Sequence, residues 1–191
     1  MKKITAIILS LIMCLALAAC GEGVKLDENE VIVGNGTWQI TKGDSVYTIM
    51  DNIVTKDEDV LYEIDNIKTY NLYALGEYLY VNTTDGAMQL KLDGSKMKKF
   101  GSGEIIAAGG RYLYYQSSDN KVGNMIVYKI DMIDGSQRNL FQDTIVSVEL
   151  IDHGVYLFTG ESGNQYVNEI NDDNGYFYHE WLGEDVTEAT E

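Results

Sequence analysis

Proline is absent from this 191-residue chain, and cysteine occurs only at Cys14 and Cys20. Without proline, the residue that most strongly interrupts β-ladders is missing, so long runs of paired strands are permitted. If Cys14 is removed with an N-terminal targeting segment, one cysteine remains and no disulfide can form within the chain. Stability must then come from packing and strand pairing, unlike that of disulfide-rich secreted domains.

The sequence is also poor in motifs for catalysis and metal binding. His153 and His179 are the only histidines, and neither has a metal-ligand spacing with another histidine or a cysteine. We interpret both as surface residues, and we expect no metal and no cofactor. No Gly-x-Ser-x-Gly nucleophile motif or phosphate-binding loop is present, and the glycine pairs at 101–103 and 160–163 are interpreted as turns.

Positive charge is scarce as well. The chain has 14 Lys+Arg against 30 Asp+Glu, which gives a formal net charge of −16. Such a chain is repelled by phosphate backbones and by anionic lipid head groups, so we expect no nucleic acid partner. Solvation alone explains most of this acidity, and a cationic ligand remains the alternative.

The N-terminus, in contrast, has the form of a secretory signal. Lys2 and Lys3 precede an apolar run over Ile4–Leu17, and small residues follow. The sequence Leu-Ala-Ala-Cys-Gly over residues 17–21 resembles the lipobox of bacterial lipoproteins. The resemblance implies cleavage before Cys20 and a lipid on the Cys20 thiol, which would hold the protein on the extracytoplasmic face of the cell membrane. An uncleaved membrane helix is the alternative, although a span needs about 20 apolar residues.

These features divide the chain into four parts. Residues 1–19 are predicted to be the signal peptide, residues 20–30 a polar tether, residues 31–182 the folded body and residues 183–191 an acidic tail.

The body contains an internal repeat. Its first motif is a glycine, two variable residues and an aliphatic–aromatic pair. The four copies begin at Gly43, Gly76, Gly110 and Gly154, with steps of 33, 34 and 44 residues. A second motif follows each copy, and it is found at 62–65, 90–93, 128–131 and 168–171. Ile130 and Ile170 are 40 residues apart, which suggests that the third and fourth units are in register.

Each unit has the pattern of antiparallel strands. Apolar and polar residues alternate, with many Tyr, Val and Ile, and the pairs Asp93-Gly94, Asp134-Gly135 and Asn174-Gly175 are typical of tight hairpins. We predict strands over 71–75, 78–83, 88–92 and 96–100 in the second unit, 105–108, 112–117, 125–130 and 136–141 in the third, and 146–150, 155–159, 165–170 and 176–181 in the fourth. In the first unit we predict 38–41, 45–50 and 60–64, with no clear fourth strand and a polar interruption over 51–59.

Four-stranded units of about 40 residues are typical of β-propeller blades. We therefore predict an all-β, propeller-like array of about four antiparallel four-stranded repeats, forming a small or incomplete propeller. Val31–Val33 could pair with the fourth unit and close the ring, and an open or sandwich-like stack is the alternative.

Two segments of the third unit carry a further resemblance, namely 112–115 (Tyr-Leu-Tyr-Tyr) and 128–135 (from Tyr-Lys-Ile-Asp to Asp-Gly). They resemble the repeats of Gram-positive surface proteins that look like low-density-lipoprotein-receptor-type or TolB-like propellers. The resemblance extends over about residues 37–182 and implies a six-bladed ring, which is more units than this chain has.

The other candidate ligand groups have structural explanations. The run Asp172-Asp173-Asn174-Gly175 lacks the alternating spacing of a calcium loop, and we interpret it as a hairpin turn. Tyr176, Tyr178 and Trp181 could stack on a sugar or peptide. However, the 14 tyrosines recur at strand positions, so packing explains most of them.

The sequence thus favours a non-catalytic binding or scaffolding module at the cell surface, with a protein or glycan partner on the loops at one end of the blades. An extracytoplasmic polysaccharide hydrolase or lyase that uses paired carboxylates is the alternative. A sensor of the envelope state is a third hypothesis.

Overall fold

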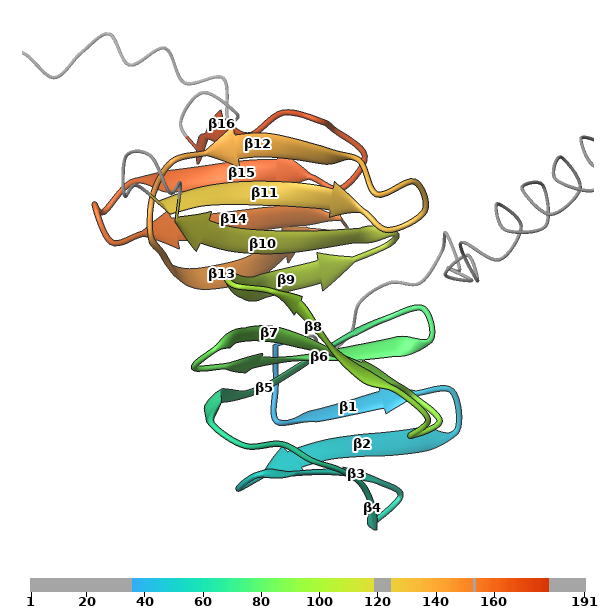
Figure 1. Ribbon diagram of the computed structural model, residues 1–191. Helices are drawn as coiled ribbons and strands as arrows, with labels where there is room; N and C mark the ends of the chain where they lie inside the picture. The colour runs from blue at the N-terminus through green and yellow to red at the C-terminus, as the bar shows by residue number, and fades with distance from the viewer. Residues whose placement is uncertain (1–35, 119–124, 153, 179–191) are drawn as a thin grey trace, which may run out of the picture.

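The computed structural model describes residues 36–118, 125–152 and 154–178, and its elements are β-strands arranged in four sheets (Figure 1). The first sheet consists of β1 (Gln39–Lys42), β2 (Ser45–Met50), β3 (Ile53–Lys56) and β4 (Asp59–Glu63). The second consists of β5 (Ile67–Leu75), β6 (Tyr78–Thr83), β7 (Gly86–Lys91) and β8 (Met97–Gly101). The third consists of β9 (Glu104–Gly109), β10 (Tyr112–Ser118), β11 (Met125–Asp131) and β12 (Gln137–Phe141). The fourth consists of β13 (Ile145–Asp152), β14 (Val155–Gly160), β15 (Gln165–Glu169) and β16 (Tyr176–Phe177).

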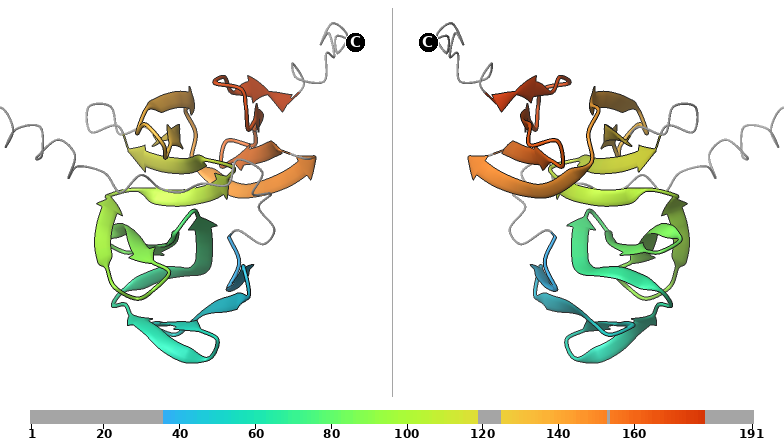
Figure 2. Two further views of the ribbon diagram at one scale, coloured as in Figure 1. Left: turned by 90° about the vertical axis from the view of Figure 1, so that its right-hand side faces the viewer. Right: turned by 90° about the vertical axis from the view of Figure 1, so that its left-hand side faces the viewer.

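The four sheets form a β-propeller-like array. Within each sheet the strands are antiparallel and follow one another in sequence order. The first strands of the sheets are neighbours, because β1 contacts β5, β5 contacts β9 and β9 contacts β13. Figure 2 shows the sheets following one another along an arc, with the first and fourth at its ends. The prediction of an all-β, propeller-like repeat is therefore confirmed.

The glycine that begins the first motif occupies a turn with positive φ in every unit. Gly43, Gly76, Gly110 and Gly154 each lie in the two-residue turn between the first and second strands, with φ between 55° and 79°. A residue with a side chain is strained at such angles, so glycine suits the turn.

The hydrophobic core lies between the sheets and consists of three clusters. One joins the first and second sheets around Leu72, Leu79 and Leu90, and another joins the second and third around Tyr80 and Leu113. The remaining cluster joins the third and fourth sheets and contains many aromatic rings: Tyr114, Tyr156, Phe158 and Tyr166. Each sheet therefore buries its apolar face on the next one, as propeller blades do.

The first unit departs from the predicted strand assignment. The stretch over 51–59, which we interpreted as a polar interruption, contains β3 and the turn after it. The strand predicted over 60–64 is thus β4, the fourth strand and not the third. Asp57 and Glu58 form the turn with positive φ, and Asp57 also accepts a hydrogen bond from the Val46 N–H. A short strand next to a charged turn has too few apolar residues to be recognised by its pattern.

The fourth unit departs from the predicted register. Gly154 is the second residue of its turn, whereas Gly43, Gly76 and Gly110 are the first of theirs. The motif's aromatic residue, Phe158, consequently faces back to the third sheet, with its ring centroid 5.3 Å from that of Tyr114.

The second motif is displaced in the same unit. Ile130 lies within β11 opposite Leu113, whereas Ile170 follows the end of β15. The assumption that these two isoleucines are equivalent was therefore wrong. By strand pairing, the counterpart of Ile130 is Asn168, which lies opposite Tyr156, so Ile170 is displaced by two residues. The register between strands decides this position, and sequence spacing does not reveal it.

Closure of the ring by Val31–Val33 is a prediction that falls outside the described residues, as do Cys20, Trp181 and the acidic tail. Among the described strands, the larger contacts between sheets run from the first to the fourth in order, and none of similar extent joins the fourth to the first. Within the same residues we find no helix that is both long enough and apolar enough to span a bilayer.

Candidate functional site

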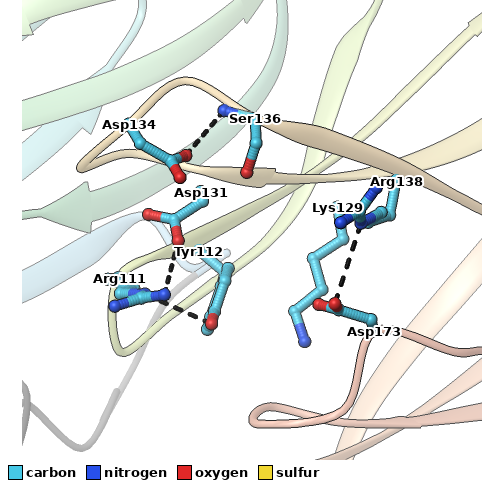
Figure 3. Close-up of a pocket in the computed structure, with 8 residues that line it drawn as sticks. All are labelled: Arg111, Tyr112, Lys129, Asp131, Asp134, Ser136, Arg138 and Asp173. Atoms are coloured by element: carbon cyan, nitrogen blue, oxygen red, sulfur yellow. Dashed lines mark hydrogen bonds and ion pairs between the residues drawn. The ribbon is translucent and has the colours of Figure 1, made fainter.

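A polar hollow of about 180 Å³ lies beside the junction of the third and fourth sheets (Figure 3). Its lining comes mostly from turns and strand ends of the third sheet: Arg111, Tyr112, Lys129, Asp131, Asp134, Ser136 and Arg138, with Asp173 from the fourth sheet. These groups lie at the end of the sheet where the first strand turns into the second and the third into the fourth.

The hollow concentrates the rare positive charge of this chain. Arg111 and Arg138 are the only arginines of the sequence, and both line it together with Lys129. Three carboxylates, Asp131, Asp134 and Asp173, line the same space. The hollow is therefore close to neutral in a strongly acidic protein, and it presents donors and acceptors together.

Arg111 is held at one side of the hollow by several contacts. Its guanidinium lies 2.7 Å from the carboxylate of Asp131, and its Nε donates a 3.2 Å hydrogen bond to the Tyr112 hydroxyl. Asp131 is buried, with 8% of its side chain exposed, while 40% of the Arg111 side chain remains exposed. Because guanidinium has five N–H donors, Arg111 keeps donors for a ligand after making both contacts.

Arg138 is held more loosely. Its Nε is 3.7 Å from the Asp173 carboxylate, beyond hydrogen-bond distance, and both side chains are more than 60% exposed. Such an exposed pair contributes little to stability, about 0–1 kcal/mol. Arg138 is thus the cation of the hollow that can turn most readily to an incoming anion.

Lys129 has a structural role. It is 2% exposed, and its ammonium donates to three backbone carbonyl oxygens of the fourth sheet: Glu169 (3.2 Å), Ile170 (2.6 Å) and Asp172 (2.6 Å). The ammonium also lies 4.2 Å from the Tyr112 ring centroid. Burial lowers the pKa of Lys129 to about 8, and the nearby Asp173 and Asp172 oppose this shift. Lys129 therefore joins the third sheet to the fourth and also lines the hollow.

A buried amide extends this junction. Asn168 is fully buried, and its Oδ1 accepts a 2.7 Å hydrogen bond from the Tyr114 hydroxyl. Its Nδ2 donates to the carbonyl oxygens of Asp172 and Asn174. These bonds hold the loop that carries Asp173, so this side of the hollow is attached to a buried hydrogen-bond network.

The candidates taken from the sequence are mostly structural. Asp172 Oδ1 accepts from the Asn174 N–H, and its Oδ2 accepts from the Tyr176 hydroxyl, so this run is a local turn. Among the tyrosines, seven belong to the buried core: Tyr47, Tyr62, Tyr73, Tyr80, Tyr114, Tyr156 and Tyr166. Cys20, His153, His179 and Trp181 lie outside the described residues. No cluster of three potential ligands among His, Cys, Asp and Glu was found in the described ranges.

Sequence reasoning missed Arg111, Lys129 and Arg138. One signal was available, since the two arginines flank the best-conforming repeat motifs, directly after Gly110 and three residues after Gly135. No signal marked Lys129, because an alternating strand pattern assigns a lysine to a solvent-facing position.

No family model matches the chain, and no curated protein matches it. Solved structures that are similar to it include a complex of a S. cerevisiae Dbp5 variant bound to Nup159, Gle1, IP6 and ADP, and the N-terminal domain of Nup159. The identities are 12% and 11%, and the TM-scores are 0.48 and 0.46. Each match covers 75% of this chain, which spans about half the length of the two structures (46% and 47%). At these values the likeness carries no information about ligand or function.

Proposed function

We propose that the protein is a membrane-anchored, extracytoplasmic lipoprotein that acts as a non-catalytic binding or scaffolding module. The observation that supports this proposal is the polar hollow, in which both arginines of an acidic chain meet on a framework fixed by Lys129 and Asn168. Preformed polar groups on a rigid scaffold favour recognition, because little conformational entropy is lost on binding.

The size and charge of the hollow indicate what it would bind. A volume of about 180 Å³ is smaller than the 300–1,000 Å³ of drug-sized ligand sites. It suits one anionic group of a larger partner, such as a carboxylate of a protein side chain or of an acidic sugar. Arg138 and the free donors of Arg111 would bind the anion, and Ser136 and Asp134 lie beside them for polar groups next to it.

The alternative, a polysaccharide hydrolase or lyase, receives one point of support, since Asp131, Asp134 and Asp173 meet in the hollow. A general acid needs a raised pKa. Within the described residues, each carboxyl whose pKa departs from its ordinary value is lowered: Asp57, Asp93, Asp134, Asp143 and Asp172. For Asp134 the main cause is the hydrogen bond from the Ser136 N–H. We therefore favour binding.

The binding proposal is tested with an array of acidic and neutral cell-surface glycans and peptides, probed with the mature protein. We expect binding to acidic members, a loss of at least tenfold in affinity for Arg138→Gln, and no change for the matched charge removal Lys56→Gln on the first sheet. Equal binding by wild type and Arg138→Gln would show that the hollow is not the binding site. Product formation on any glycan, abolished by Asp134→Asn, would favour the enzyme.

The anchor is tested separately by labelling cells with palmitate. We expect the label in wild type and its absence in Cys20→Ala, which would also move from the membrane to the soluble fraction. Unlabelled wild-type protein would refute lipidation, while the binding proposal would stand.

A further inference from the structure

The outer edge of the second sheet carries a basic strip. The strand order is β5-β6-β7-β8, so β8 is the last strand, and one of its edges has no strand beside it among the described residues. Lys96, Lys98 and Lys99 lie on or directly before β8, and all three are exposed. We call these three residues and Met97 the lysine edge.

The charges of this edge are not neutralised by the described part of the protein. Lys91 pairs with Asp93, and Lys68 pairs with Glu104. Lys96, Lys98 and Lys99 form no comparable ion pair there, although the whole chain has more than twice as many acids as bases. A group of unpaired cations in so acidic a chain is attractive to an anionic partner.

The lysines project from both faces of the sheet. Lys98 lies opposite Gln89 and Lys99 lies opposite Met88, and neighbouring positions of a strand point to opposite faces. A flat lipid surface would reach the cations of one face only. An extended peptide paired along the edge would place its own side chains on both faces, next to Lys98 on one and Lys99 on the other.

The backbone of the edge is free to pair. The Lys91 N–H donates to the Lys96 carbonyl oxygen at 2.9 Å, so these two residues form a hydrogen-bonded pair of the β7–β8 ladder. Hydrogen-bonded and non-bonded pairs alternate in antiparallel ladders, and the next pair is Leu90 with Met97. The N–H and C=O of Met97 therefore point away from β7, toward the open edge.

The strand is also held in place. The Phe100 ring packs edge-on against Tyr80 and Tyr115, with centroid distances of 5.4 and 5.8 Å. A fixed edge strand loses little entropy when another strand adds to it.

We propose that the lysine edge is a docking site for an extended acidic peptide of a partner protein, which adds to the second sheet as a fifth strand. Backbone hydrogen bonds at Met97 would provide affinity, and carboxylates on alternate faces would provide specificity. This surface is distinct from the polar hollow, and the proposal depends neither on it nor on the lipid anchor.

The probe is a ten-residue synthetic peptide that alternates glutamate with valine or threonine, and its control carries lysine in place of glutamate. Binding to the protein is measured by fluorescence anisotropy, and amide hydrogen exchange is measured over residues 96–101. We expect the acidic peptide alone to bind, to bind more weakly at high salt, and to slow the exchange of the Met97 amide.

Two variants separate the contributions. Met97→Pro removes an outward N–H while all lysines remain, and proline is tolerated at such edge positions. Lys98→Glu/Lys99→Glu reverses one charge on each face. We expect each to weaken binding at least tenfold, whereas the control Lys42→Glu in the first sheet leaves it unchanged. If Met97→Pro does not fold, the double charge variant and the exchange pattern of the wild type decide.

Three results would overturn the proposal. Binding without slowed exchange at Met97 would indicate unspecific charge attraction. Equal affinity for vesicles containing anionic lipid, unaffected by Met97→Pro, would assign the edge to the membrane. If the acidic peptide does not bind, the lysines would instead be explained as charges that prevent edge-to-edge aggregation.

Discussion

Between the first and second sheets the contact is made mostly by aliphatic side chains with two tyrosines, whereas between the third and fourth it includes a buried lysine, a buried amide and several aromatic rings. In the first junction, the side-chain hydrogen bonds include those of the Tyr62 hydroxyl, which lies 2.8 Å from the carbonyl oxygens of Lys91 and Lys96. In the other, the Lys129 ammonium and the Asn168 amide bond backbone carbonyls directly.

This difference shows that a repeat can keep its backbone while the chemistry between its units changes. Lys129 lies opposite Tyr114, and the corresponding residue of the second sheet, Gln89, lies opposite Tyr80. The Gln89 side chain donates to the Tyr80 hydroxyl at 3.0 Å and, among the described residues, to no backbone carbonyl. The polar junction is the one that borders the hollow, so its stability and the geometry of the candidate site are coupled.

The largest change in the free energy of unfolding should come from a substitution in the apolar junction between the first and second sheets. Leu79 is fully buried between the first and second sheets. We expect Leu79→Ala to lower the free energy of unfolding by about 3 kcal/mol, because it removes apolar contacts and leaves a cavity. Urea unfolding followed by circular dichroism measures the change. A loss below about 1 kcal/mol would contradict the view that this junction depends on close packing.

The second largest change in the free energy of unfolding should come from a substitution in the polar junction between the third and fourth sheets. We expect Lys129→Met to lower the free energy of unfolding by about 2 kcal/mol, since three carbonyls lose a charged donor while the apolar stem is retained. The matched control Lys99→Met, on the exposed edge of β8, should change it by less than about 0.5 kcal/mol. Similar values for the two variants would mean that Lys129 is not a structural link.

The same lysine predicts a pH dependence. The pKa of Lys129 is about 8 in the folded protein, against 10.5 for an ordinary lysine. Between these values the unfolded chain binds more protons, so this group makes the folded state relatively more stable as pH rises. The free energy of unfolding of wild type relative to Lys129→Met should therefore increase from pH 8 to pH 10, in urea titrations at several pH values. A constant difference would place the Lys129 pKa outside this range.

The smallest effect is expected on the outward face of the first sheet. Met50 is 64% exposed and packs against no preceding sheet among the described residues. We expect Met50→Ala to change the free energy of unfolding by less than about 0.5 kcal/mol. A loss near that of Leu79→Ala would show that another part of the chain covers this face, and thermal unfolding of both variants in parallel would detect it.

Much of the fold could be predicted because it depends on local patterns. The strands of the second and third sheets lie within a few residues of their predicted positions, since apolar alternation and glycine turns are strong there. The first unit was assigned less well because β3 is short and borders charged residues. The candidate site could hardly be predicted at all, because Arg138 and Asp173 are 35 residues apart and meet only when two sheets pack.

The repeat, the turn positions and most of the strands could be predicted from the sequence, because periodicity and positive-φ glycines are properties of neighbouring residues. The sequence also contains the segment over residues 17–21 that resembles a lipobox, and from it we predict the anchor. The tertiary structure was needed to show which face of the fourth unit meets the third, that Lys129 is buried, and that both arginines line one hollow. Those facts follow from the register and stacking of the sheets. Both depend on the whole core and cannot be recognised from a local sequence pattern.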